Sequence, residues 1–505
     1  MTVKNKVVHT NNEVNQPQQQ PTTNLSDAET SNATEIPPSI EVKTEETTGL
    51  VLRDPAELLD SMLEQVGLKD FKQALTKDKE QLKDKHQQII VVETIMEIAD
   101  HNKWGLCKQN AFLYIYNGAY WQVVEEHVIR TFLKKAAEKM GVDKYDARYF
   151  VFGDQLVKQF SDQGYLPAPK GRTDCILINL LNGTFEITSE GQRLRSHDSG
   201  DFLTYQLPFS YDPSAKAPQW QQFLDKVLPD KECQKVLAEF IGYLFVSASL
   251  LKLEKALLLF GSGANGKSVF FEVIMALLGP ENVSNYSLNS LTNDPAYHRA
   301  HLANKILNYA SEINGRLEAS IFKQLVSGEP VEARLPYGQP FIMHRYAKLI
   351  FNTNELPTDV EHTNAFFRRF LIVPFSVTIP EAEQDKELAT KIIESELSGV
   401  FNWVLDGLNR LLQQKKFTDC KAILQQLESY KRESDSVHLF LNENEYTPDP
   451  CDLRPLKDLY HEYRGFCVDE GYKPVSSKNF KKRLENIGIT IEKKSIGLSV
   501  YIRKF

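Results

Sequence analysis

The sequence predicts an α/β core with a smaller mixed α+β unit on each side. Between Lys255 and Phe375, apolar strand-like runs alternate with helical runs, which is the pattern of a sheet covered by helices. Ahead of this core, short apolar runs such as Phe112–Tyr116 are followed by turn residues and mix with helical stretches. Behind it, two amphipathic helices precede a hairpin. The length of 505 residues fits about three folding units.

Composition places the chain among folded proteins and excludes several classes. Hydrophobic residues make up 42%, and 59 Lys+Arg against 67 Asp+Glu give a net charge of −8. The longest apolar run, Phe240–Leu251, is shorter than the roughly 20 residues of a membrane span, so we expect no membrane partner. The N-terminus has no apolar signal segment. The 6 cysteines are scattered, so we expect no zinc site or disulfide framework and a reducing cytoplasm.

The chain divides into five segments by composition and periodicity. The first 50 residues lack Phe, Tyr and Trp and are rich in Gln, Asn, Thr, Glu and Pro, which is typical of a disordered tail. After this tail the spacing of apolar residues becomes helical, with Leu58, Leu59, Met62 and Val66 on one stripe. We predict a tail at 1–52, a helical linker at 53–94, an α+β domain at 95–215, a core with a preceding helical collar at 216–425, and a C-terminal unit at 431–505.

The sharpest motif is a phosphate-binding loop between a predicted strand and a predicted helix. Ala256–Phe260 is a strand-like run, and Val269–Leu278 reads as a helix stopped by Gly279-Pro280. Lysine in such a loop reaches the β and γ phosphates of ATP, and the following serine hydroxyl ligates Mg²⁺. The alternative is an ordinary glycine turn. The eight residues match G-x-x-x-x-G-K-[ST] at every fixed position: Gly261, Ser262, Gly263, Ala264, Asn265, Gly266, Lys267 and Ser268.

Later strands supply candidates for the rest of a nucleotide site. Glu312 ends a second apolar run, where a carboxylate orders Mg²⁺ or polarises the attacking water. Asn354 ends a third run, and its neutral amide can bind the γ-phosphate or the lytic water. Arg368 and Arg369 precede a fourth run and can offset transition-state charge at a neighbouring subunit, with Arg369 slightly preferred. The alternatives are an exposed strand end, a turn-capping Asn and surface ion pairs.

A hairpin between the second and third strands is a candidate DNA contact. Val331–Phe341 turns around Pro336–Gln339, and basic or aromatic groups lie in and around it. Such groups grip the phosphates of a single strand and stack on its bases. A purely structural hairpin is the alternative. The candidate residues are Lys323, Arg334, Tyr337, His344 and Arg345.

The C-terminal unit is predicted to be a winged helix that binds DNA. Helices at Asp452–Glu470 and Ser476–Ile487 precede a hairpin at Ile489–Lys504. Residues 471–505 hold nine Lys+Arg against two Glu, so their net charge is 9 − 2 = +7. A solvated helix face is the alternative. The candidate contacts are Lys478, Lys481, Lys482, Arg483, Lys493 and Lys494.

The order of these motifs resembles the superfamily 3 helicases, which are AAA+ ATPases of small viruses, phages and plasmids. Gly263–Ser268, Asn354-Glu355-Leu356-Pro357 and the Arg368-Arg369 pair are similar to the phage/plasmid primase-helicase family. The resemblance covers roughly residues 95–505. It implies an AAA+ core, a homo-hexameric ring, ATP hydrolysis at subunit interfaces and 3′→5′ movement on single-stranded DNA, in the cytoplasm of a bacterial host.

Two departures from the family pattern qualify this expectation. Ser311 precedes Glu312 where many members carry two adjacent acids, and the segment ahead of residue 95 is too short for a primase domain. We therefore expect no priming activity, and a separate primase or polymerase as partner.

Three functions compete for this sequence. The leading one is an ATP-dependent helicase that acts on single-stranded and forked DNA during replication of a mobile element. The second is an origin-binding initiator that uses ATP to assemble and melt DNA. The third, a small-molecule kinase, leaves the basic C-terminal unit unexplained.

Overall fold

The computed structural model describes most of the chain between Asp54 and Lys504. The predicted tail lies outside the described residues, as do Glu312 and Tyr337. Everything described belongs to one compact unit, Val42–Phe505. Within it, none of the helices combines the length and apolar character needed to cross a lipid bilayer. The described residues are 54–73, 81–165, 174–293, 296–311, 313, 317–336, 338–357, 360–495 and 497–504.

The N-terminal helices share one hydrophobic core. Leu58 and Met62 of the first helix and Val91 and Ile95 of the second are buried together with Phe132 of the third. Residues of the expected helical linker 53–94 therefore pack into the same core as residues that follow them. The elements are α1 (Pro55–Gln65), α2 (Asp84–His101), α3 (Glu126–Met140), α4 (Lys144–Arg148) and α5 (Phe150–Gln163), with an antiparallel sheet of β1 (Leu106–Gln109), β2 (Phe112–Tyr116) and β3 (Trp121–Val124).

A second antiparallel sheet packs against the collar and the core. Phe185 lies with its ring centroid 6.3 Å from that of Phe401, and both belong to a hydrophobic core separate from that of α1–α5. The predicted segment 95–215 therefore divides among three hydrophobic clusters, the smallest of which contains Tyr114 and Trp121. The elements are β4 (Ile176–Leu180), β5 (Gly183–Thr188), β6 (Gly191–Arg195), η1 (Ser199–Asp201), α6 (Pro218–Val227) and α7 (Lys231–Tyr243).

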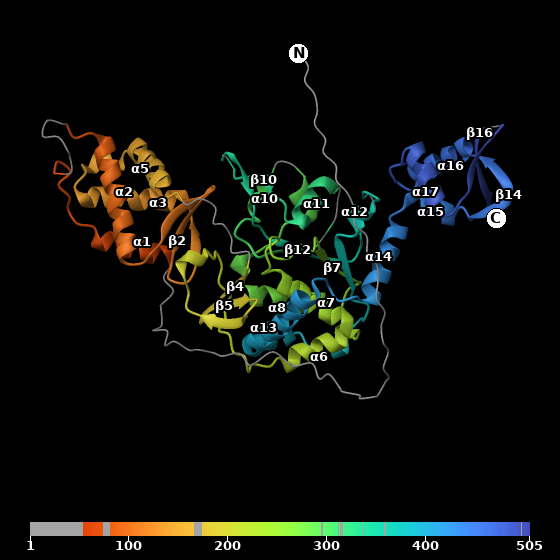
Figure 1. The fold of residues 1–505 in the computed structure, drawn as a ribbon, viewed down its shortest axis with the longest axis horizontal. Helices are drawn as coiled ribbons and strands as arrows, with labels where there is room; N and C mark the ends of the chain where they lie inside the picture. Colours follow the sequence, from red (N-terminus) through yellow and green to blue (C-terminus); the bar gives the residue numbers. More distant parts are fainter. Residues whose placement is uncertain are drawn as a thin grey trace, which may run out of the picture. The chain divides into compact units, whose positions relative to one another are not determined.

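A five-stranded parallel sheet forms the centre of the core (Figure 1). Its order is β13-β7-β12-β9-β8, so the first strand in sequence lies between the last and the fourth. Parallel strands buried on both faces read as continuous apolar runs, which is why Ala256–Phe260 was recognisable as a strand. The strands are β7 (Ala256–Phe260), β8 (Val283–Ser284), β9 (Leu307–Ala310), β12 (Lys348–Thr353) and β13 (Phe370–Pro374).

Helices cover both faces of this sheet. Leu257 and Leu259 of β7 point to the face covered by α6, α7, α8 (Lys267–Leu278) and α13 (Leu388–Gln414). Ala256 and Leu258 point to the opposite face. That face is covered by α9 (Leu288–Thr292), α10 (Tyr297–Ala300), α11 (Ala319–Ser327), α12 (Asn364–Phe367) and α14 (Lys421–Glu433); η2 (Pro280–Asn282), η3 (Glu381–Glu383) and the hairpin of β10 (Val331–Arg334) and β11 (Pro340–Met343) complete the core.

The C-terminal unit combines three helices with a three-stranded antiparallel sheet. The predicted helix at Asp452–Glu470 begins only at Leu456, because the residues before it belong to a strand that the sequence analysis missed. That strand contains three prolines and an irregular register, features that disguise a strand at the edge of a sheet. The elements are α15 (Ser436–Glu443), β14 (Tyr446–Pro455), α16 (Leu456–Asp469), α17 (Ser477–Asn486), β15 (Ile491–Lys494) and β16 (Gly497–Lys504).

Two of the scattered cysteines meet in space. The Sγ atoms of Cys233 and Cys420 lie 3.3 Å apart, although the residues are 187 positions apart in the sequence. Both side chains are buried, and burial raises the pKa of the Cys233 thiol. The spacing of cysteines along the chain therefore did not reveal this pair of free thiols.

Candidate nucleotide-binding site

The phosphate-binding loop connects β7 to α8 at the carboxyl edge of the parallel sheet. Gly266 begins the helix with a φ of +87°, and a Cβ there would lie 2.6 Å from Val227 Cγ1. Around Gly263, in contrast, no neighbouring heavy atom lies within 4 Å of an ideal Cβ position. One glycine therefore permits the turn, and the other leaves the loop open to a ligand. Ligands of parallel α/β sheets bind beyond the carboxyl ends of the strands.

The Asn265 side chain hydrogen-bonds the phosphate-binding loop to the residue that follows β13. Its side chain is buried, and its Nδ2 donates to the Phe375 carbonyl at 3.0 Å and to the Ser262 carbonyl. Its Oδ1 accepts from Lys267 Nζ at 3.2 Å. Because Phe375 directly follows β13, these bonds fix the loop against that strand and hold the lysine in position.

Lys267 and Asn354, two of the residues predicted for the nucleotide site, meet in the structure. Lys267 Nζ lies 3.2 Å from Asn354 Oδ1 and also donates to the carbonyls of Gly261 at 2.5 Å and Ser262 at 3.0 Å. Burial lowers the pKa of the Lys267 ammonium. The parallel pairing of β7 with β12 brings the two side chains together from positions 87 residues apart.

The predicted magnesium ligands are only partly described. Ser268 is exposed in the first turn of α8, with its hydroxyl at the same edge of the sheet. The strand ahead of Glu312, β9, pairs with β12 in parallel, with Ala310 opposite Phe351. Glu312 itself lies outside the described residues. The described residues thus contribute one hydroxyl oxygen of the kind that Mg²⁺ prefers.

The two arginines of the predicted pair differ in their environments. The Arg369 side chain is 9% exposed, donates to Ser327 Oγ at 3.0 Å and to the Ala365 carbonyl, and lies 3.4 Å from a carboxylate oxygen of Glu254. The Arg368 side chain is 61% exposed and reaches the same carboxylate at 2.7 Å. Arg369 is therefore engaged within its own chain. The geometry favours Arg368 for any role that requires reaching a second subunit, against the preference for Arg369 drawn from the sequence.

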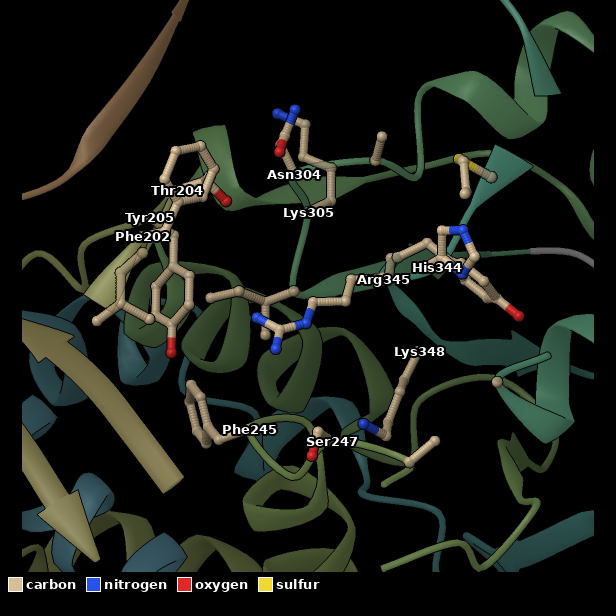
Figure 2. Close-up of a pocket in the computed structure, with 18 of the residues that line it drawn as sticks. Phe202, Thr204, Tyr205, Phe245, Ser247, Asn304, Lys305, His344, Arg345 and Lys348 are labelled. Atoms are coloured by element: carbon tan, nitrogen blue, oxygen red, sulfur yellow. The ribbon is translucent and has the colours of Figure 1, made fainter. Parts of the chain in front are cut away.

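The predicted contacts around the hairpin fall into three groups. Lys323 is held by Glu361 at 2.8 Å, and this lysine lowers the pKa of the Glu361 carboxyl group. Arg334 is exposed and donates locally to the Gly338 carbonyl at 2.9 Å. His344 and Arg345 are exposed beyond β11 and line a cavity (Figure 2). Tyr337 lies outside the described residues.

The basic residues of the C-terminal unit are not equally available. Arg483 forms an ion pair with Asp435 at 2.7 Å, with both side chains largely buried. Lys481 lies 3.6 Å from Glu485, and Lys494 lies 2.7 Å from Glu492. Among the predicted contacts, the exposed lysines with no described acidic partner are Lys478, Lys482 and Lys493.

Glu254 and the Phe375 carbonyl are parts of the site that the sequence analysis missed. Glu254 has a positive φ of 54° and accepts ion pairs from both Arg368 and Arg369. The Phe375 carbonyl holds Asn265. A main-chain oxygen leaves no signal in a sequence, and a lone glutamate between two lysines reads as ordinary surface charge.

Three sequence families match consecutive parts of the chain. Residues 92–229 match a family described as D5 N terminal like, and residues 432–495 match one described as Poxvirus D5 protein-like. Residues 259–369, which include the phosphate-binding loop and Asn354, match a family of unknown function, DUF5906.

Individual proteins resemble the chain at low identity. "Putative helicase L207/L206" of Acanthamoeba polyphaga mimivirus is 21% identical over 329 residues, which is 62% of this chain and 33% of that protein. The chain therefore spans about a third of the length of this relative. The apo structure of the NrS-1 C-terminal region is 12% identical, covers 81% of this chain and 98% of its own, and gives a TM-score of 0.47. A second structure of that region gives 0.43 at 12% identity, covering 82% and 99%. Two of the three family matches are thus to D5-like models, and the mimivirus relative is a putative helicase.

Proposed function

We propose that the chain is an ATP-dependent DNA helicase that acts as a homo-hexameric ring during replication of a phage, plasmid or other mobile element. The contact between Lys267 Nζ and Asn354 Oδ1 at 3.2 Å carries the proposal, because it joins a complete phosphate-binding motif to a polar group on the adjacent strand. D5-like matches lie on both sides of this site in the sequence. The strand order β13-β7-β12-β9-β8 supports our assignment of the core to the AAA+ fold of superfamily 3.

In this proposal the residues of the loop bind the phosphates of ATP. The N–H groups of 261–266 and the N-terminus of α8 surround the phosphates, and Lys267 balances their charge. Ser268 and Glu312 would hold Mg²⁺, which neutralises charge on the phosphate oxygens. Asn354 positions the attacking water without adding negative charge.

Arg368 acts across the subunit interface in this mechanism. Its exposed ion pair with Glu254 contributes little stability, so the guanidinium is free to exchange that carboxylate for a γ-phosphate. Charge that develops on the transferring phosphoryl group is then stabilised by a residue of the next subunit. Arg369 remains in its buried contacts and supports the strand on which the pair stands.

The hairpin and the C-terminal unit would engage DNA. Exposed Arg334 on β10 and the exposed lysines of the C-terminal unit supply charge for the phosphates of the strand. Three helices with a three-stranded antiparallel sheet are consistent with the winged helix that we assign to residues 431–505. Phosphate contacts of this kind position a protein on DNA without reading its sequence.

Strand displacement tests the proposal. Forked duplexes with a single-stranded 3′ or 5′ tail are incubated with the chain and ATP, with a non-hydrolysable analogue, or with the Lys267→Ala variant. We expect displacement only with ATP, only with the unchanged chain, and with a 3′ tail. ATP-dependent complex formation and melting without displacement would instead identify the initiator. Failure to hydrolyse ATP in the presence of single-stranded DNA would refute the helicase, and absence of ATP-dependent complex formation as well would refute both functions.

A further inference from the structure

A cavity of about 580 Å³ lies at the edge of the sheet opposite the phosphate-binding loop (Figure 2). Its walls include residues that precede β9, residues that begin β12, and the turn 243–249 that follows α7. Its volume is within the range of roughly 300–1,000 Å³ that is typical of small-ligand sites. Lys267 and Asn354 lie at the carboxyl ends of the strands, so this cavity is separate from the nucleotide site described above.

The cavity has an excess of positive charge. Among the described lining residues, Lys305, Arg345 and Lys348 face a single acidic residue, Asp201, which gives 3 − 1 = +2 when Lys348 is protonated. Asp201 is already held by Arg195 at 2.7 Å. Arg345 is exposed and has no carboxylate partner among the described residues. The balance of charge therefore favours an anionic ligand.

Lys348 brings its charge into this cavity without an acidic partner among the described residues. Its Nζ donates to the Val246 carbonyl at 2.6 Å and lies 4.4 Å from the ring centroid of Tyr243. Desolvation lowers the pKa of this ammonium group to about 7. Carbonyl dipoles and an aromatic face offset a buried charge only in part, so a phosphate at this position would complete its neutralisation.

Aromatic rings form the wall opposite the cations. Phe202, Tyr205 and Phe245 line the cavity, with the ring centroids of Tyr205 and Phe245 6.3 Å apart. Figure 2 shows Arg345 extending toward Tyr205 and Phe245, and Lys348 extending toward Ser247. Flat aromatic faces beside guanidinium and ammonium groups match a ligand that has both an aromatic base and a phosphate.

We propose that this cavity is a second nucleotide-binding site, in which Arg345 and Lys348 bind the phosphate and Tyr205 and Phe245 contact the base. Ser247 supplies a hydroxyl for the same phosphate or the sugar. The site takes no part in hydrolysis at Lys267, and for a strand unit as ligand it rests on the proposed function, because Arg345 is also one of the candidate DNA contacts. The ligand is either a free mononucleotide or one nucleotide unit of a single strand, since both present the same chemistry.

Calorimetric titration of the full chain tests this site. The titrated protein is the Lys267→Ala variant, which lacks the lysine of the phosphate-binding loop, so that binding at that loop does not contribute. It is titrated with thymidine monophosphate and, separately, with pentathymidylate. We expect binding of one ligand per chain, weakened at least about tenfold by adding Arg345→Gln, because a charge-assisted hydrogen bond is lost. Lys421→Gln removes an exposed charge on α14 outside the cavity and should change neither affinity. Binding of the monophosphate that Arg345→Gln weakens identifies a free nucleotide, and binding of pentathymidylate alone that Arg345→Gln weakens identifies a unit of a strand.

Two results would overturn the proposal. One is that neither probe binds the Lys267→Ala chain. The other is that Arg345→Gln and Lys348→Met, each with a melting temperature no lower than that of the unchanged chain, leave both affinities within twofold. Because the titrations need no hydrolysis, they are independent of strand displacement, and a failure of the helicase proposal would appear only in the displacement assay.

Discussion

Replacing Arg368 and Arg369 by alanine, one at a time, separates a structural arginine from one that reaches a neighbouring subunit. The two residues are adjacent and face the same carboxylate of Glu254, so they form a matched pair of variants. We expect Arg369→Ala to unfold more easily and Arg368→Ala to keep its stability but lose ATP hydrolysis in the assembled ring.

The expected loss for Arg369→Ala follows from its contacts. The variant removes charge-assisted hydrogen bonds to Ser327 Oγ and the Ala365 carbonyl and an ion pair of a side chain that is 9% exposed. Each such bond contributes about 1.5–3 kcal/mol. Glu254 keeps Arg368 as a partner, so the penalty for an unpaired buried charge is avoided. We therefore expect the free energy of unfolding to fall by about 3–6 kcal/mol, or the melting temperature by roughly 6–24 °C.

The expected loss for Arg368→Ala is small, because its side chain is 61% exposed. An ion pair of this kind contributes between about 0 and 1 kcal/mol. Melting curves of the two variants and the unchanged chain, recorded at one protein concentration, measure both effects. The reasoning from burial is refuted if Arg368→Ala melts lower than Arg369→Ala.

Mixing experiments test whether Arg368 acts on a neighbouring subunit. Arg368→Ala keeps an intact phosphate-binding loop, and Lys267→Ala keeps an intact arginine, so an equal mixture contains interfaces that combine both. About a quarter of the interfaces in randomly mixed rings are of this kind. We expect two inactive variants to recover ATPase activity when mixed. Normal hydrolysis by Arg368→Ala alone would show that this arginine has no such role.

Three further variants probe the loop, the cavity and the C-terminal surface. Asn265→Ala should leave a buried carbonyl unpaired and therefore lower the free energy of unfolding by about 1–3 kcal/mol, which melting curves measure. It should also raise the KM for ATP, which steady-state ATPase assays measure. The folded-state pKa of Lys348 is lowered to about 7, below its unfolded value, so its unfavourable contribution is present at low pH and disappears as pH rises. The stability difference between Lys348→Met and the unchanged chain should therefore shrink by about 1.4 kcal/mol per pH unit between pH 7 and 10, and a pH-independent difference would contradict this. The third variant replaces Lys478, Lys482 and Lys493 together by glutamine. The slope of log affinity for single-stranded DNA against log salt concentration should become shallower by about 2. An unchanged slope in binding titrations at several salt concentrations would exclude these contacts.

The parallel sheet and the phosphate-binding loop could be predicted because their signals are local. A strand such as Ala256–Phe260 is apolar throughout, and the loop between it and α8 carries its motif in eight consecutive residues. Lys267 and Asn354 were expected in one nucleotide site, but their contact depends on the strand order, because β7 and β12 are neighbours although β8 and β9 lie between them in sequence.

Features that depend on side-chain burial or on long-range contacts were not predictable. Two adjacent arginines look equivalent in a sequence, and only the packing around α11 and α12 shows that Arg369 is enclosed and Arg368 is not. Cys233 and Cys420 meet because α7 and the residues before α14 are neighbours in the fold. The irregular strand β14 carries prolines that resemble a loop, so its pairing with β16 had no local signal.

The ammonium group of Lys267 already has hydrogen-bond acceptors within the chain, and a bound phosphate would compete with them. Its three protons are shared among two carbonyl oxygens of the loop and two side-chain amide oxygens, so in the proposed mechanism an arriving triphosphate displaces acceptors that belong to the chain itself. In the proposed mechanism, the same acceptors bind the lysine again when the cleaved phosphate departs. We therefore expect weaker binding of ATP and faster release of product than in a loop whose lysine has no such acceptors.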